Sequence, residues 1–66
     1  MKKENIIQGG LYTLSKTTGK YEKGTDVIFM WWTTGWELCH CNPVGFPSLA
    51  DSIEVGPEYL EEVVFN

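Results

Sequence analysis

The sequence predicts a single small, mostly β domain of five short antiparallel strands, with one short helical or 3-10 turn near the C-terminus. Three observations carry this prediction. The chain has 66 residues, which suits one thin-cored domain. Its apolar residues come in short alternating or β-branched runs, and glycines and prolines separate these runs. We therefore expect one domain over residues 1–66, with the polar residues 1–5 flexible.

The first strand is expected at residues 10–15. Tyr12 and Leu14 would share one face of this strand, and Leu11 and Thr13 the other. Two glycines lie where the chain enters the strand, which indicates a bend or a bulge there.

The clearest strand is expected at residues 26–33, which are β-branched and aromatic and lie between two glycines. Regular alternation puts an apolar set on each face: Val27, Phe29 and Trp31 on one, Ile28, Met30 and Trp32 on the other. A strand that is apolar on both faces is typically central in its sheet. Because neighbours on a strand point in opposite directions, Trp31 and Trp32 cannot share one face.

A hairpin is expected to follow, with a tight turn at residues 33–35 and Gly35 in the left-handed conformation. The return strand is expected at residues 36–41, before Pro43 ends it. Alternation assigns Trp36, Leu38 and His40 to one face of this strand, and Glu37, Cys39 and Cys41 to the other.

Residues 44–52 read as a loop whose apolar anchors, Phe46 and Leu49, fold back onto the core. A short strand at residues 52–55 follows this loop, with Ile53 and Val55 pointing inward.

The C-terminal segment begins with a turn of helix, in which Pro57 suits the first helical position. A last strand over residues 62–65 is expected after this turn. A single two-turn helix over residues 59–65 is the alternative for the same segment.

Charge is unevenly distributed along the chain. The net charge is −4, and arginine is absent. Residues 1–36 hold all five lysines and three acidic residues, for a net of +2, whereas residues 37–66 hold six acidic residues and no lysine, for a net of −6. Nucleic-acid binding usually depends on clustered lysine and arginine, so this distribution disfavours it.

The two cysteines, Cys39 and Cys41, flank His40. On a strand the thiols share one face and the imidazole lies on the other, which suits neither a four-ligand zinc site nor a Cys–His catalytic pair. We expect no metal site, and reduced cysteines that pack as small hydrophobes in a cytoplasmic protein. The longest apolar run has six residues, so we expect no membrane span, and the N-terminus does not resemble a signal peptide.

No residue set supports catalysis. The sequence has one histidine, no phosphate-binding glycine loop and no nucleophile elbow around a serine. We therefore expect a protein that is not an enzyme and that carries no cofactor and no catalytic residue.

The chain resembles small SH3-like β-barrels over residues 9–65. The resemblance is carried by the glycine-led strand at residues 10–14, the hairpin at residues 26–41 and the closing segment at residues 55–64, with its Pro57-Glu58 turn. It implies a five-stranded antiparallel barrel, a shape that hosts many unrelated functions. Barrels of this kind are common among small bacterial and phage proteins, which implies an accessory protein of such a source.

The leading functional hypothesis is a protein-binding, accessory or inhibitory module that uses an aromatic and acidic surface. Its candidate residues are Trp31, Trp32, Trp36, Glu54, Glu58, Glu61 and Glu62. The partner would be another protein or a second copy of the chain. The alternatives are nucleic-acid binding through Lys16, Lys20 and Lys23, and mimicry of nucleic-acid phosphates by the glutamates. A purely structural alternative is that residues 42–52 cover the outward tryptophan with their apolar side chains.

Overall fold

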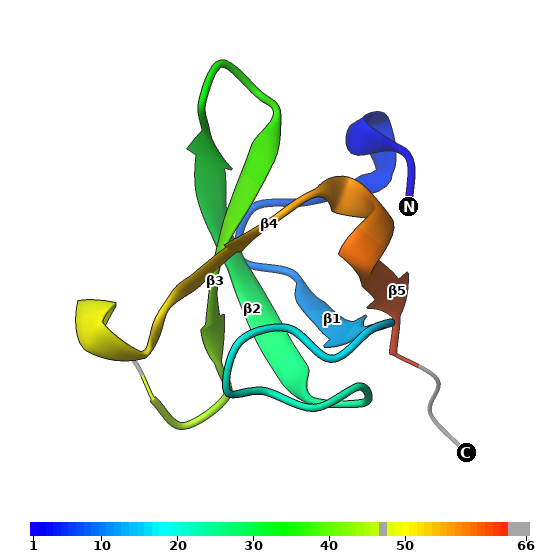
Figure 1. Cartoon of the computed structure of the whole chain (residues 1–66). Helices are drawn as coiled ribbons and strands as arrows, with labels where there is room; N and C mark the ends of the chain where they lie inside the picture. The colour runs from blue at the N-terminus through cyan, green and yellow to red at the C-terminus, as the bar shows by residue number, and fades with distance from the viewer. Residues whose placement is uncertain (47, 64–66) are drawn as a thin grey trace.

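A computed structural model describes residues 1–46 and 48–63 of the chain. Its strands are β1 (Leu11–Leu14), β2 (Asp26–Thr33), β3 (Leu38–Pro43), β4 (Ile53–Val55) and β5 (Leu60–Glu62). Its 3-10 turns are η1 (Lys3–Asn5), η2 (Leu49–Asp51) and η3 (Pro57–Tyr59). The mostly β prediction is confirmed, as is the helical turn near the C-terminus, which is η3 (Figure 1).

The five strands form one antiparallel sheet in the order β4-β3-β2-β1-β5. The strand at residues 26–33 lies at its centre, as the two-faced apolar pattern predicts. The two edge strands, β4 and β5, are separated along the chain only by residues 56–59, which include η3. In Figure 1 the turn between β2 and β3 stands at the top of the view, at the opposite end of the hairpin from η2.

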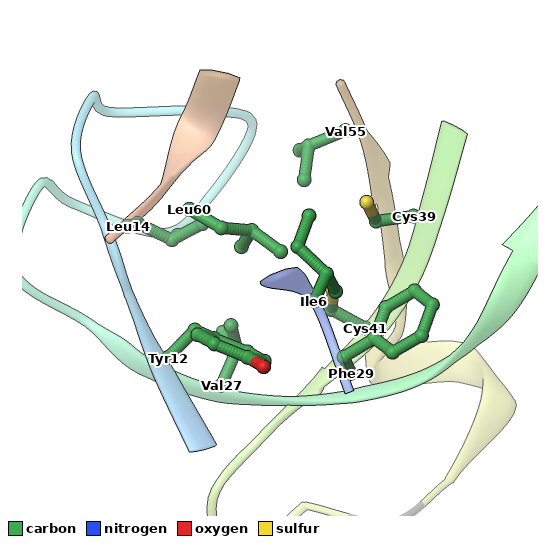
Figure 2. Close-up of a cluster of buried hydrophobic side chains, with 9 residues drawn as sticks. All are labelled: Ile6, Tyr12, Leu14, Val27, Phe29, Cys39, Cys41, Val55 and Leu60. Atoms are coloured by element: carbon green, nitrogen blue, oxygen red, sulfur yellow. The ribbon is translucent and has the colours of Figure 1, made fainter. Parts of the chain in front are cut away.

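The core lies on one face of this sheet. Alternate residues of the three central strands supply Tyr12 and Leu14, Val27 and Phe29, and Cys39 and Cys41. Val55 and Leu60 from the edge strands and Ile6 from the N-terminal segment complete the cluster, with Ile6 near its middle (Figure 2). We call this the core face of the sheet, and the opposite side the outer face.

A β-bulge at Met30 changes the expected faces of β2. Phe29 pairs with Cys41 and Trp31 pairs with His40, so two steps along β2 match one step along β3. The extra residue shifts the alternation by one position. The prediction that Trp31 shares a face with Phe29 is therefore wrong: Trp32 takes that place and packs against the core, whereas Trp31 lies on the outer face beside His40.

The return strand begins later than predicted. Trp36 and Glu37 belong to the hairpin turn, and β3 runs from Leu38 to Pro43. The turn is longer than expected because Gly35 is left-handed, as predicted, and so is Trp36 after it. The backbone N–H of Glu37 closes the turn by donating to the carbonyl oxygen of Thr33, at 3.2 Å.

Residues 44–52 do not anchor onto the core as predicted. Phe46 is 57% exposed and Leu49 is 71% exposed. Polar contacts hold this segment instead: the buried Asn42 side chain donates to the carbonyl oxygens of Phe46 and Ser48, at 3.0 and 2.9 Å. Because these hydrogen bonds satisfy the backbone, the loop keeps its shape without burying its apolar side chains.

The C-terminal strand begins earlier than predicted, since β5 covers Leu60–Glu62. The expectation for Val64 and Phe65 falls outside the described residues. The short strand at Ile53–Val55 confirms the expectation for residues 52–55, although Val55 is buried and Ile53 only partly so. In the described ranges, no helix is both long and apolar enough to cross a membrane.

Close packing joins the N-terminal segment to β1. The hydroxyl of Tyr12 accepts a hydrogen bond from the backbone N–H of Ile7, at 2.7 Å. Gly10 lies directly beside this contact, and a Cβ atom there would lie 2.8 Å from the Ile7 carbonyl oxygen and 2.9 Å from the Tyr12 hydroxyl. Gly10, one of the two glycines that predict a bend here, is thus required by a close approach of the Ile7 backbone and the Tyr12 ring.

Candidate functional site: the hairpin tryptophans and the outer face

The three tryptophans of the hairpin occupy different environments. Trp32 is partly buried, and its ring meets Phe29 edge-on with centroids 5.3 Å apart. Trp31 and Trp36 are exposed, at 43% and 68% of their surface. The sequence-based expectation that Trp31 and Trp32 project in opposite directions agrees with these positions, and Trp31 is the outward one.

Trp31 covers the imidazole of His40. The two rings are stacked with centroids 4.3 Å apart and planes within 6°. His40 is consequently only 7% exposed, although it lies on the outer face. Within the described ranges, its Nε2 is the buried side-chain nitrogen or oxygen that lacks a hydrogen-bond partner. A buried polar atom without a hydrogen-bond partner lowers the free energy of unfolding by about 1–3 kcal/mol. The stacked indole of Trp31 therefore covers His40 at a cost in stability.

Trp36 stands on a strained turn. Thr34, Gly35 and Trp36 all have positive φ angles, of 51°, 62° and 71°. Glycine adopts this left-handed backbone conformation freely, whereas each β-branched or bulky residue in it costs about 1–2 kcal/mol. Strained backbone of this kind is concentrated at functional sites, where it holds a side chain in position. Here it presents an indole to solvent.

A cavity of about 490 Å³ opens between the hairpin and the N-terminal segment. Trp32 and Trp36 both line it, with ring centroids 6.1 Å apart, and Ile6 and Gln8 line its other side. The ammonium group of Lys3 lies 6.0 Å from the Trp32 ring centroid, at the limit of a cation–π contact.

The outer face carries a second hollow, which we call the outer groove. It has a volume of about 290 Å³ and is lined by Ile28, Met30, Asn42, Pro43, Gly45 and Phe46. Its lining is almost entirely apolar, and the hydrogen bonds from Asn42 fix the Phe46 side of it. The sequence does not predict this groove, because the bulge that places Met30 there has no recognisable sequence signal.

The four glutamates expected at a partner surface do not form one row. Glu54 and Glu58 line a common hollow of about 400 Å³, together with Glu37 from the hairpin turn. Glu61 and Glu62 lie on β5, at the other end of the strand order, and pair with Thr13 and Tyr12. All four side chains are exposed.

Three lysines already contact other side chains of the protein. Lys20 pairs with Asp51, with Nζ and Oδ1 3.4 Å apart, and lies 5.5 Å from the Tyr21 ring. Lys16 lies 5.2 Å from the ring of Tyr59. Among the cation–π contacts of the described residues, that of Lys3 is the one that involves a tryptophan, and this tryptophan is the partly buried Trp32.

The cysteines pack as expected. Cys39 and Cys41 are free thiols that are fully buried in the core. Burial raises the pKa of Cys39 to about 11 and that of Cys41 to about 12, so both thiols stay protonated at neutral pH and are poor nucleophiles. The described residues contain no group of three His, Cys, Asp or Glu side chains placed to hold a metal ion.

Comparisons of the chain with models of protein families, with curated proteins and with solved structures give no match.

Proposed function

We propose that this protein is a non-enzymatic protein-binding module whose contact surface is the β2–β3 hairpin with its exposed tryptophans, Trp31 and Trp36. One observation carries the proposal: Trp36, 68% exposed, sits on a turn with three consecutive left-handed residues. Exposed tryptophan is costly for solubility and is concentrated at the energetic centres of protein interfaces. A contact between the exposed Trp36 ring and a protein partner would explain why the chain keeps this strained turn.

The charges around the hairpin favour a protein partner over a nucleic acid. Glu37 follows Trp36 directly, and Glu54 faces Thr33 at the end of β2, accepting a hydrogen bond from its hydroxyl at 3.2 Å. Carboxylates beside the exposed rings would repel a phosphate backbone. The same carboxylates would attract basic residues on the surface of a protein partner.

The proposed module is a small SH3-like barrel in the cytoplasm. The strand order and the four-residue link between the two edge strands support curling of the sheet. In such a shape the hairpin turn and the outer face stay accessible, and Glu61 and Glu62 lie on β5, at the opposite edge of the sheet from β4.

Comparative capture tests the proposal. Immobilised wild-type protein, Trp36→Ala and the matched control Leu49→Ala are incubated with the same lysate, and any captured protein is then purified and titrated. Leu49 is a suitable control because it is also an exposed apolar side chain, at 71%, but lies on η2. The proposal requires a partner whose direct affinity falls at least about tenfold with Trp36→Ala and is unchanged with Leu49→Ala.

Two results would overturn it. The first is identical capture by Trp36→Ala and wild type. The second is a salt-dependent affinity for oligonucleotides that is lost on replacing Lys16, Lys20 and Lys23, which would make the chain a nucleic-acid-binding protein instead.

A further inference from the structure

The outer groove is an apolar hollow between fixed walls. Ile28 and Met30 of β2 form its floor, and Phe46 forms an exposed wall. The Asn42 side chain, itself 5% exposed, holds the carbonyl oxygen of Phe46 at 3.0 Å, so the wall is fixed to β3. Because this hollow is already formed in the free protein, binding there costs little conformational entropy.

Apolar surface continues from the groove along the sheet. Leu11 pairs with Ile28 across β1 and β2 and is 38% exposed. Trp31 follows Met30 and lies on the same outer face over His40. The exposed apolar surface is therefore a continuous strip and not a set of isolated side chains, which is the usual mark of an interaction site.

Carboxylates flank this strip at both ends. Asp26 and Glu61 lie at one end, since both are paired with Thr13 on the outer face. Glu54 lies at the other end, in the cross-strand row that contains Trp31 and His40. Lys20 and Asp51 make the one ion pair found within the described residues, so none of these three carboxylates has a basic nitrogen within 4.0 Å there.

The two acidic ends are a short distance apart. The backbone N–H of Val44 donates to the carbonyl oxygen of Asp26, so Asp26 lies level with Val44, and Glu54 lies level with His40. Four residues of strand separate these levels, about 13 Å at 3.3 Å per residue. Glu54 on β4 also lies two strands, or about 10 Å, to the side of Asp26 on β2, so the two positions are about 16 Å apart. An extended chain that crosses the strands obliquely spans about 13 Å between residues i and i+4, and its residue i+2 points to the same side. Long basic side chains at positions i and i+4 cover the remaining distance.

From this geometry we infer the class of partner: an extended segment with two basic side chains that flank an apolar one, in the order basic-x-apolar-x-basic. The apolar side chain fills the outer groove between Met30 and Phe46. One basic side chain meets Asp26 and Glu61, and the other meets Glu54. The inference rests on the proposed protein-binding function and names the kind of segment that the module recognises.

Fluorescence anisotropy with a defined probe tests this inference. The probe is a fluorescein-labelled peptide that repeats the order Lys-Ser-Leu-Ser, and two matched peptides replace its lysines by glutamate or its leucines by serine. We expect saturable binding of the first peptide that weakens with added salt, and binding at least about tenfold weaker for each matched peptide.

Variants locate the site. Phe46→Ser should weaken binding of the lysine–leucine peptide by about tenfold, and Asp26→Asn and Glu54→Gln by about threefold each. Glu62→Gln and Leu49→Ser are the controls, since they change an exposed carboxylate and an exposed apolar side chain elsewhere, and should leave the affinity unchanged. Because Phe46 is exposed, its replacement should not unfold the protein. The methyl resonance of Met30 should shift on titration in the wild type.

Equal affinity for the glutamate peptide, or peptide binding that Phe46→Ser leaves unchanged, would overturn the inference. So would burial of the groove by a second copy, seen as a concentration-dependent dimer that Phe46→Ser dissociates. The absence of peptide binding together with Trp36-dependent capture of a protein would remove this inference and leave the proposed function standing. Loss of Trp36-dependent capture would remove the proposed function itself.

Discussion

The indole of Trp31 lies flat on the imidazole of His40, with ring centroids 4.3 Å apart and an interplanar angle of 6°. The two residues are direct cross-strand partners, and their contact exists because the bulge at Met30 places Trp31 on the outer face. The same bulge places Trp32 beside Phe29 on the core face. One extra residue in β2 thus determines which tryptophan stabilises the fold and which is available to a partner.

The three tryptophans should differ in their contribution to stability. Trp32→Ala removes a partly buried ring from the core and should lower the free energy of unfolding by about 2–3 kcal/mol, below the ~3–5 kcal/mol of a fully buried aromatic. Trp36→Ala removes an exposed ring and should change it by less than about 0.5 kcal/mol. Urea denaturation followed by circular dichroism measures both changes, and a Trp36→Ala loss equal to that of Trp32→Ala would contradict the assignment.

Relief of the backbone strain at Thr34 should stabilise the protein. Thr34→Asn puts a residue that tolerates the left-handed region at a φ of 51°, where a β-branched residue is strained. The expected gain is about 0.5–1 kcal/mol in the free energy of unfolding, measured by urea denaturation. Thr33→Asn is the control, because Thr33 lies in β2 and asparagine is unfavourable in a strand. A loss of stability in Thr34→Asn would show that the turn is not strained as described.

Gly10 should not tolerate a side chain. A Cβ atom at this position would lie 2.8 Å from a backbone oxygen and 2.9 Å from the Tyr12 hydroxyl, so Gly10→Ala must displace β1 or the N-terminal segment. We expect a loss of about 1–3 kcal/mol in thermal or urea denaturation. Gly56→Ala is the matched control: the three atoms nearest to its Cβ would all belong to the flexible carboxylate end of Glu58, which can move away. Equal losses in the two variants would refute the proposed tight approach.

The buried thiols should make stability fall at high pH. Burial raises the pKa of Cys39 and Cys41 from the ordinary value of 9.0 to about 11 and about 12, so the folded state holds protons that the unfolded chain releases. Their contribution is complete below pH 9 and declines as the pH rises towards the folded pKa values, by up to about 1.4 kcal/mol per pH unit for each thiol.

Urea denaturation between pH 8 and pH 10.5 measures this decline. The double variant Cys39→Ala, Cys41→Ala is the control, since it keeps the tyrosines and lysines that also ionise in this range. Its stability should depend less steeply on pH than that of the wild type. If the free energy of unfolding falls equally with pH in the wild type and the double variant, burial does not raise the pKa values of the thiols as described.

Much of the fold could be predicted from the sequence, because alternation and punctuation are local signals. The strand at residues 26–33 has the bounds that its composition indicates, and Pro57 begins η3 as its fixed φ angle favours. Cys39 and Cys41 pack into the core on one face, as two strand residues with one residue between them must.

The candidate site could be predicted only in part, because it depends on departures from regular geometry. Met30 looks like any other residue of an alternating strand, and its bulge appears only in the pairing with β3. Phe46 resembles a core anchor in sequence, but Asn42 supplies the hydrogen bonds that hold its loop without burial. Neither effect has a short-range sequence signal, so the outer groove could not be foreseen.

Fluorescence quenching of single-tryptophan variants tests the central claim most directly. In each variant the other two tryptophans are replaced by phenylalanine, and acrylamide quenching of the remaining indole is measured. The structure predicts the strongest quenching for Trp36, intermediate quenching for Trp31 and the weakest for Trp32. If Trp32 is quenched more strongly than Trp31, the bulge does not divide the two indoles between the faces as described, and the proposed surface is wrong.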